Sequence, residues 1–135
     1  MRIIMGLGLA FGLAFGLAGV AGAGEVPTEV SKLAGQTITL HVQPFLTDSE
    51  LSTLRLVATN KQAMQLFVTS AKGYAAIAVA PKEGFIRDGA PVASATAISE
   101  LPDAASATAA ALKGCDDKRK GGAACVIVLE VGPGR

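Results

Sequence analysis

The sequence predicts an α+β fold, with a small antiparallel sheet of about four strands packed by about two helices and held by one disulfide bond. Two segments, residues 48–60 and 101–114, carry helix-start signals ahead of apolar side chains at helical spacing. Segments with the apolar patterns of β-strands lie before, between and after them. The two cysteines, Cys115 and Cys125, flank a short polar loop ahead of the last strand.

An export leader is the most informative feature of the N-terminus. Arg2 is followed by an uncharged apolar run from Ile3 to Ala23, which ends in the small residues Ala-Gly-Ala. Signal peptidase needs this small-x-small pattern, so we expect residues 1–23 to be a signal peptide cleaved between Ala23 and Gly24. The mature chain would then work in the periplasm or outside the cell.

The same run is long enough to be an uncleaved membrane-spanning helix, since a bilayer span needs about 20 apolar residues. A repeated Leu-Ala-Phe-Gly places Gly8, Gly12 and Gly16 on one helix face, where small residues pack helices in lipid. The alternative is therefore an envelope protein anchored through residues 3–23. The small residues before Gly24, and the lack of basic residues after the run, favour cleavage.

Size and charge restrict what the mature chain can be. We expect a flexible N-terminal segment at residues 24–35, a single α+β domain at residues 36–131 and a C-terminal tail at residues 132–135. The chain has 12 basic and 11 acidic side chains, and cleavage of the leader removes the basic Arg2. The mature chain then has equal numbers of basic and acidic side chains. A surface without net charge does not attract nucleic acid, so we expect no nucleic-acid partner.

Export changes the interpretation of the cysteines, because an even cysteine count in an oxidising compartment predicts a disulfide. The loop between Cys115 and Cys125 is polar and contains glycine, so it can turn and bring the two sulfurs together. A reactive thiol pair would favour the CxxC spacing, which is absent. We therefore predict a structural Cys115–Cys125 bridge.

In the first half of the domain, residues 36–43 alternate polar and apolar side chains and predict a half-buried strand. His41, the only histidine, lies on the face opposite the apolar residues and points to solvent or to a partner. Thr47 and Glu50 have the spacing of a capping box and predict a helix from about Asp48 to Asn60. We expect a break near Asn60 and then an extended run over residues 64–69.

In the second half, residues 73–80 predict a strand, residues 81–84 a turn, and residues 85–99 an extended return that pairs antiparallel with the strand. A helix is then expected, with Pro102 in its first position and Gly114 as its stop signal. We expect Ala105, Ala109 and Leu112 to share its packing face. The β-branched run at residues 125–131 predicts a central buried strand.

A resemblance rests on these C-terminal features. A hairpin, an alanine-rich helix ending in cysteine and a cysteine-led, valine-rich strand over residues 73–131 resemble small exported bacterial domains of unknown function. Residues 51–68, with their Leu-Val-Ala-Thr-Asn-Lys-Gln-Ala core, are similar to uncharacterised exported proteins of alphaproteobacteria. The resemblance implies a fold and brings no catalytic residues with it.

No catalytic motif emerges from the sequence. It has no GxSxG, HExxH, CxxC or phosphate-binding loop, so we expect no metal and no cofactor. We therefore expect a non-enzymatic exported domain that binds a protein or small-molecule partner. The alternative is a small envelope hydrolase in which folding brings a hydroxyl or carboxylate to His41. Phe85 and Arg87, with His41, are the candidate binding edge, although Phe85 also suits the core.

Overall fold

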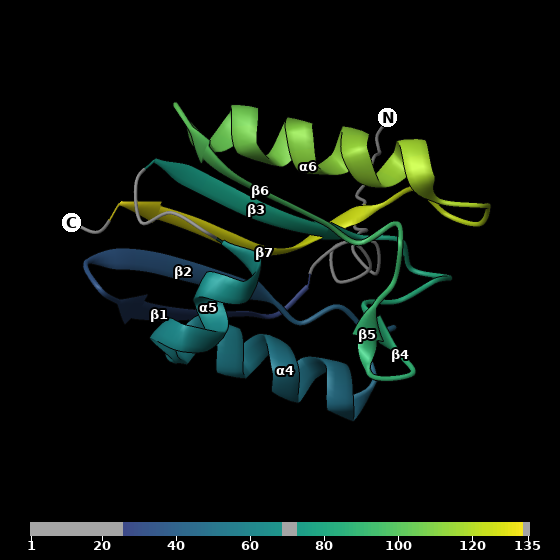
Figure 1. Ribbon diagram of the computed structural model, residues 1–135, viewed down its shortest axis with the longest axis horizontal. Coiled ribbons are helices and arrows are strands. Elements are labelled where there is room, and N and C mark those ends of the chain that lie inside the picture. Colours follow the sequence, from purple (N-terminus) through teal and green to yellow (C-terminus); the bar gives the residue numbers. More distant parts are fainter. Residues whose placement is uncertain (1–25, 69–72, 134–135) are drawn as a thin grey trace, which may run out of the picture.

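The computed structural model describes residues 26–68 and 73–133, and these form three layers (Figure 1). A five-stranded antiparallel sheet in the order β1-β2-β7-β3-β6 lies in the middle, with α6 on one face and α4 and α5 on the other. The elements are β1 (Thr28–Leu33), β2 (Gln36–His41), α4 (Asp48–Thr59), α5 (Lys61–Phe67), β3 (Tyr74–Val79), β4 (Ile86–Arg87), β5 (Ala90–Pro91), β6 (Thr96–Leu101), α6 (Ala104–Lys118) and β7 (Val126–Pro133). The predicted α+β class is confirmed. Among the described residues, the central sheet has one strand more than expected, the β4–β5 ribbon is additional, and there is one helix more.

Strand β1 corrects the expectation of a flexible segment at residues 24–35. It forms a hairpin with β2, in which Val30 lies opposite Thr39. Ala34 and Gly35 both have positive φ, 53° and 80°, as the two-residue turn of such a hairpin requires. The alternation signal is weak because β1 is an edge strand and its central apolar residue, Val30, is 64% exposed. At the other end of the chain, β7 continues to Pro133, so the expected tail is partly strand.

Helices α4 and α5, which cover the same face of the sheet, meet at Asn60. The Thr47–Glu50 capping box starts α4 as predicted, since the Thr47 hydroxyl accepts from the Glu50 N–H and the Glu50 carboxylate accepts from the Thr47 N–H. Asn60 ends α4 and caps α5 through its side chain, which accepts from the Ala63 N–H. The extended run expected over residues 64–69 is wrong for its first part, because α5 turns Met64 into the core.

Strand β3 has large side chains on one face and alanines on the other. Ile77 and Val79 join the large core beneath α4 and α5, whereas Ala76, Ala78 and Ala80 face α6. Because these alanines are small, α6 can approach the sheet closely. The predicted antiparallel pairing of β3 with the returning segment is confirmed, although the pairing strand is β6 only and the β4–β5 ribbon interrupts residues 85–99.

Helix α6 differs from its prediction at both ends. Its first position is Ala104, not Pro102, and the side chain of Asp103, which precedes it, accepts from the Ser106 N–H as an N-cap. Gly114 does not stop the helix, which continues to Lys118. The buried residues of its packing face are Ala107, Ala111 and Cys115, and the predicted Leu112 packs beside them. The predicted Ala105 and Ala109 are exposed instead.

The predicted disulfide is present between Cys115 and Cys125. It joins the last turn of α6 to the residue immediately before β7, and both cysteines lie in the alanine-rich core between α6 and the sheet. The predicted central position of the last strand is also confirmed, since β7 is the middle strand of five.

Candidate functional site

Part of the sheet is left open on the α6 side. Helix α6 packs over β3, β6 and the near side of β7, and it does not reach across to β2 (Figure 1). Because side chains alternate along a strand, Ile38 and Leu40 enter the core beneath, while Thr37, Thr39 and His41 lie on the open face. This face is polar because no helix covers it.

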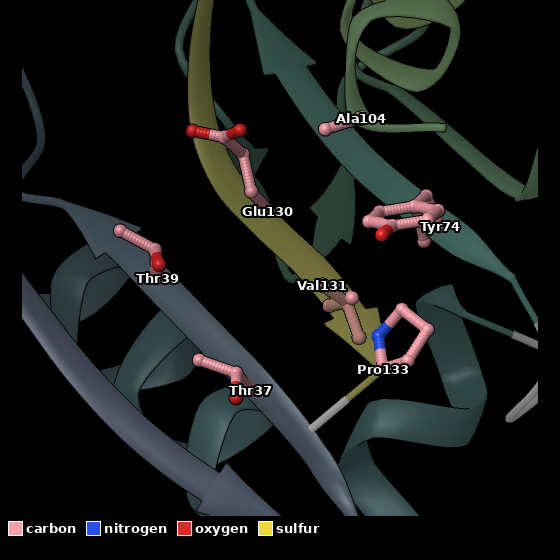
Figure 2. Close-up of a pocket in the computed structure, with 9 residues that line it drawn as sticks. Thr37, Thr39, Tyr74, Ala104, Glu130, Val131 and Pro133 are labelled. Atoms are coloured by element: carbon pink, nitrogen blue, oxygen red, sulfur yellow. The ribbon is translucent and has the colours of Figure 1, made fainter. Parts of the chain in front are cut away.

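A hollow of about 320 Å³ lies on this open face. Its lining comes from β2, β7, β3 and the start of α6: Thr37, Thr39, Tyr74, Ala75, Ala104, Glu130, Val131, Gly132 and Pro133. Figure 2 shows the two threonines on one strand and Glu130 on the next, with the Tyr74 ring at the opposite side. We call these lining residues, together with His41, the β2–β7 shelf.

His41 and Glu130 form the charged part of the shelf. The imidazole Nε2 lies 2.6 Å from Glu130 Oε2, and both side chains are half-buried. Strand pairing brings them together, because Thr39 lies directly opposite Glu130 and His41 is two residues further along the same face. A carboxylate in this position orients the imidazole ring.

Tyr74 forms the apolar side of the shelf, and Gly132 makes room for its ring. A Cβ at Gly132 would lie 2.9 Å from Cε2 of Tyr74 and 3.1 Å from Cδ2, so the ring lies directly over the glycine backbone. The shelf therefore offers an aromatic ring on one side and hydroxyl and carboxylate oxygens on the other. This combination suits a small ligand with one apolar and one polar face.

Nucleophilic catalysis needs a hydroxyl or thiol next to the imidazole as well as an orienting carboxylate. Glu130 supplies the orienting carboxylate. Within residues 26–68 and 73–133, no serine, threonine or cysteine side chain is hydrogen-bonded to His41. The same residues contain no group of three or more His, Cys, Asp or Glu side chains with the geometry to hold a metal ion.

The structure separates the residues that were grouped as a candidate binding edge. His41 lies on the shelf, but Phe85 is only 1% exposed and stacks at 5.3 Å from the Phe67 ring, so it belongs to the core. Arg87 is bound to Glu50 and projects from the β4–β5 ribbon. Phe85 is therefore a core residue and not part of an exposed edge, and the candidate binding edge is corrected on this point.

The polar and aromatic side chains of the shelf other than His41 were missed in the sequence: Thr37, Thr39, Glu130 and Tyr74. Two signals could have found the threonines and Glu130. The period-two alternation that places His41 on the open face places both threonines there too. Glu130 is the only charged residue in the apolar run at residues 125–131, and a lone carboxylate in a central strand indicates an uncovered position.

Glu50 is the most buried charged group in the described part of the chain, and all its contacts are structural. One oxygen accepts from the Phe85 and Ile86 backbone N–H groups, at 2.7 and 2.9 Å, and from Arg87 Nη1 at 2.7 Å. Burial on its own would raise the pKa of Glu50, but these hydrogen bonds, with that from Thr47 and the Arg87 charge, lower the pKa below its ordinary value. Glu50 therefore holds the β4–β5 ribbon against α4, and its hydrogen bonds leave it unsuited to a catalytic role.

The described residues include no helix that is long and apolar enough to span a membrane. The predicted leader, with Gly8, Gly12, Gly16 and the Ala23–Gly24 cleavage point, lies outside the described residues. Fold and site together define a three-layer α+β domain with a polar shelf. Comparisons with protein-family models, with curated proteins and with solved structures find no match to this chain. The resemblance to exported alphaproteobacterial proteins stays a prediction.

Proposed function

We propose that this chain is an exported, non-enzymatic domain that binds a small polar ligand on the β2–β7 shelf. The observation that carries the proposal is the uncovered face itself. Helices α4 and α5 cover one face of the central strands and α6 covers β3 on the other, yet Thr39 and Glu130 lie opposite one another on an open face beside a hollow of about 320 Å³. The hollow has the size of a small-molecule site.

The chemistry of the lining indicates the kind of ligand. Thr37, Thr39 and Glu130 offer oxygen acceptors, and the Tyr74 ring offers an apolar surface at the other side (Figure 2). A ligand with hydroxyl or amine donors on one face and C–H groups on the other matches this arrangement, as sugars and amino sugars do. The imidazole of His41 fixes the position of the Glu130 carboxylate.

Titration of small polar probes tests the shelf. Amide NMR spectra of residues 24–135 are recorded with glucose, glucosamine and glycerol, and we expect shifts that saturate and are confined to β2, β7 and Tyr74. The double variant T37V/T39V keeps the side-chain shape but removes both hydroxyl groups, so we expect it to weaken binding by about tenfold. The control is T53V on α4, where the hydroxyl bonds only to the Ser49 carbonyl. Shifts outside the shelf, or equal weakening by the control, contradict the proposal.

The hydrolase alternative has one observation in its favour, the His41–Glu130 pair. Catalytic turnover distinguishes a hydrolase from a binding domain. Incubation of the purified domain with ester, amide and glycoside substrates should yield no product above that of the H41N variant. Reproducible turnover that H41N abolishes would show an enzyme and overturn the non-enzymatic assignment.

Export is a separate part of the proposal and has its own test. The disulfide supports it, because such bridges form and persist in oxidising compartments. We expect the periplasmic fraction to hold a chain that starts at Gly24 and has no alkylatable thiol under non-reducing conditions. A full-length chain in the membrane fraction would instead indicate the anchored form, and two free thiols in the cytoplasm would contradict export.

A further inference from the structure

A second hollow lies at the opposite end of the sheet from the shelf, where the β3–β4 turn meets the disulfide loop. It has a volume of about 420 Å³ and is lined by Lys82, Glu83, Val92, Ala93, Lys118, Lys120 and Gly121. Figure 1 shows the two loops next to one another at the same end of the molecule. We call this site the lysine hollow, and it shares no residue with the β2–β7 shelf.

The aspartates of the disulfide loop do not neutralise these lysines. In the sequence, Asp116 and Asp117 stand directly before Lys118, which suggests a solvated loop of balanced charge. In the structure, Asp116 instead accepts from Arg119 Nε at 2.7 Å and from the Cys125 N–H at 2.9 Å. Asp117 accepts from Lys113 Nζ at 3.0 Å. Both carboxylates therefore already have partners other than the hollow's lysines.

Glu83 is the one carboxylate that lines the hollow, and its oxygens are also occupied. One accepts from the buried Ser94 hydroxyl, and the other accepts from the Lys120 backbone N–H. Lys82 and Lys118 form no ion pair with any described residue. Three lysines thus line a hollow that contains a single carboxylate, which leaves an excess of positive charge.

The two loops that carry these lysines are fastened together. The Lys82 stem lies against Gly122, where an added Cβ would be 2.9 Å from Lys82 Cβ and 3.0 Å from Cδ. Arg119 Nη1 donates to the Gly122 carbonyl at 2.9 Å, and the disulfide holds the base of the loop. The position of the Lys82 stem relative to Lys118 is therefore set before any ligand arrives, which reduces the entropy cost of binding.

We propose that the lysine hollow binds a phosphate group, through Lys82, Lys118 and Lys120. A phosphate oxyanion accepts several charge-assisted hydrogen bonds at once, and lysine side chains from two loops that line one hollow can supply them. A single carboxylate offers fewer acceptors and less charge. The same phosphate chemistry is offered by a free phosphorylated molecule and by the headgroup of an anionic phospholipid.

Pyrophosphate is the probe for a free phosphorylated ligand. Calorimetric titration of residues 24–135 at low ionic strength should give one saturable site, with amide NMR shifts at Lys82, Lys120 and Gly121. Affinity should fall steeply as salt is added, because the contacts are ionic. The double variant K82Q/K118Q should weaken binding by about tenfold or more. K61Q at the start of α5, on the opposite face, is the control for loss of one charge and should leave the affinity unchanged.

Vesicle sedimentation separates the two sources of phosphate. Cosedimentation with phosphatidylglycerol vesicles that is lost in K82Q/K118Q, without cosedimentation with phosphatidylcholine, identifies a lipid headgroup, while pyrophosphate binding alone identifies a free ligand. The variants change exposed side chains, and an unchanged melting temperature confirms their folding. The proposal is overturned if neither probe binds, or if K61Q weakens binding as much as K82Q/K118Q. Failure here leaves the shelf untouched, because T37V/T39V tests different residues.

Discussion

Glu50 acts both in its own helix and in a distant segment. Within α4 it completes the capping box with Thr47, and across the fold it accepts from the backbone of Phe85 and Ile86 and from the Arg87 guanidinium. The side chain is only 1% exposed, so water cannot replace a lost partner. The first function is local and follows from the Thr-x-x-Glu spacing, whereas the second joins residues 35 to 37 positions apart and has no local signal.

Replacement of Glu50 by glutamine should destabilise the domain by about 3 kcal/mol at pH 7. The amide retains one acceptor oxygen and turns an NH₂ group towards backbone N–H donors, which leaves buried donors without partners. Urea unfolding followed by circular dichroism measures the loss. The matched control is E100Q, at an exposed glutamate that forms no ion pair with any described residue, and it should stay within about 0.5 kcal/mol of the parent.

The pH dependence of this loss follows from the sign of the pKa shift. The pKa of Glu50 is lower in the folded state than in the unfolded chain, so its stabilisation is fully present above the unfolded pKa of about 4.3. It disappears as the pH falls through the folded pKa, because both states then bind the proton. The stability difference between the parent and E50Q should therefore shrink below about pH 4. A constant difference from pH 7 to pH 3 would show that the charge of Glu50 is not involved.

Helix α6 packs closely against strand β6 at Gly114, and this close contact explains why a glycine lies within the helix. A Cβ at this position would lie 2.9 Å from Cγ2 of Thr96. Thr96 cannot turn aside easily, because it is buried and its hydroxyl donates to the Ser94 carbonyl at 2.9 Å. In the sequence, Gly114 has the form of a helix stop, and only the contact with β6 reveals that it is a packing residue.

The variant G114A should lower stability by about 1 kcal/mol, although alanine favours helices over glycine by about the same amount. The reason is the collision with the Thr96 methyl group. In a T96S background, which removes Cγ2 but keeps the hydroxyl, the same G114A change should instead raise stability by about 0.5 kcal/mol. Thermal and urea unfolding of the four chains measure the coupling. An equal effect of G114A in both backgrounds would exclude this contact as the cause.

Local patterns predicted the elements that depend on their own residues. The Thr47–Glu50 box, the break at Asn60 and the apolar run at residues 125–131 correspond to α4, its end and the central strand β7. Strand β1 was missed because an edge strand needs few apolar residues. Helix α5 was missed because its seven residues contain too few turns to show a helical period.

Contacts between distant segments, at the scale of the whole molecule, could not be predicted in the same way. The alternation around His41 identified the open face, but the pairing with Glu130 depends on the register of β2 against β7, which the pattern of one strand does not contain. The lysine hollow needs both the turn after β3 and the disulfide loop, and the side chains of Asp116 and Asp117 could have faced either way. Site geometry here is a property of the assembled sheet.

The small-residue core between α6 and the sheet leaves no room for a larger side chain on that face of β3. Ala78 is 0% exposed in the small-residue core beneath α6, and Ala97 is exposed on neighbouring β6. The variant A78V should therefore destabilise the domain by about 2 kcal/mol, although valine favours strands, because the added methyl groups press on α6. A97V makes the same change where nothing covers it and should stay within about 0.5 kcal/mol of the parent. Urea unfolding compares the two. If A78V were as well tolerated as A97V, α6 would not be held close to the sheet by the alanines of β3, and the small-residue core would have to yield without cost.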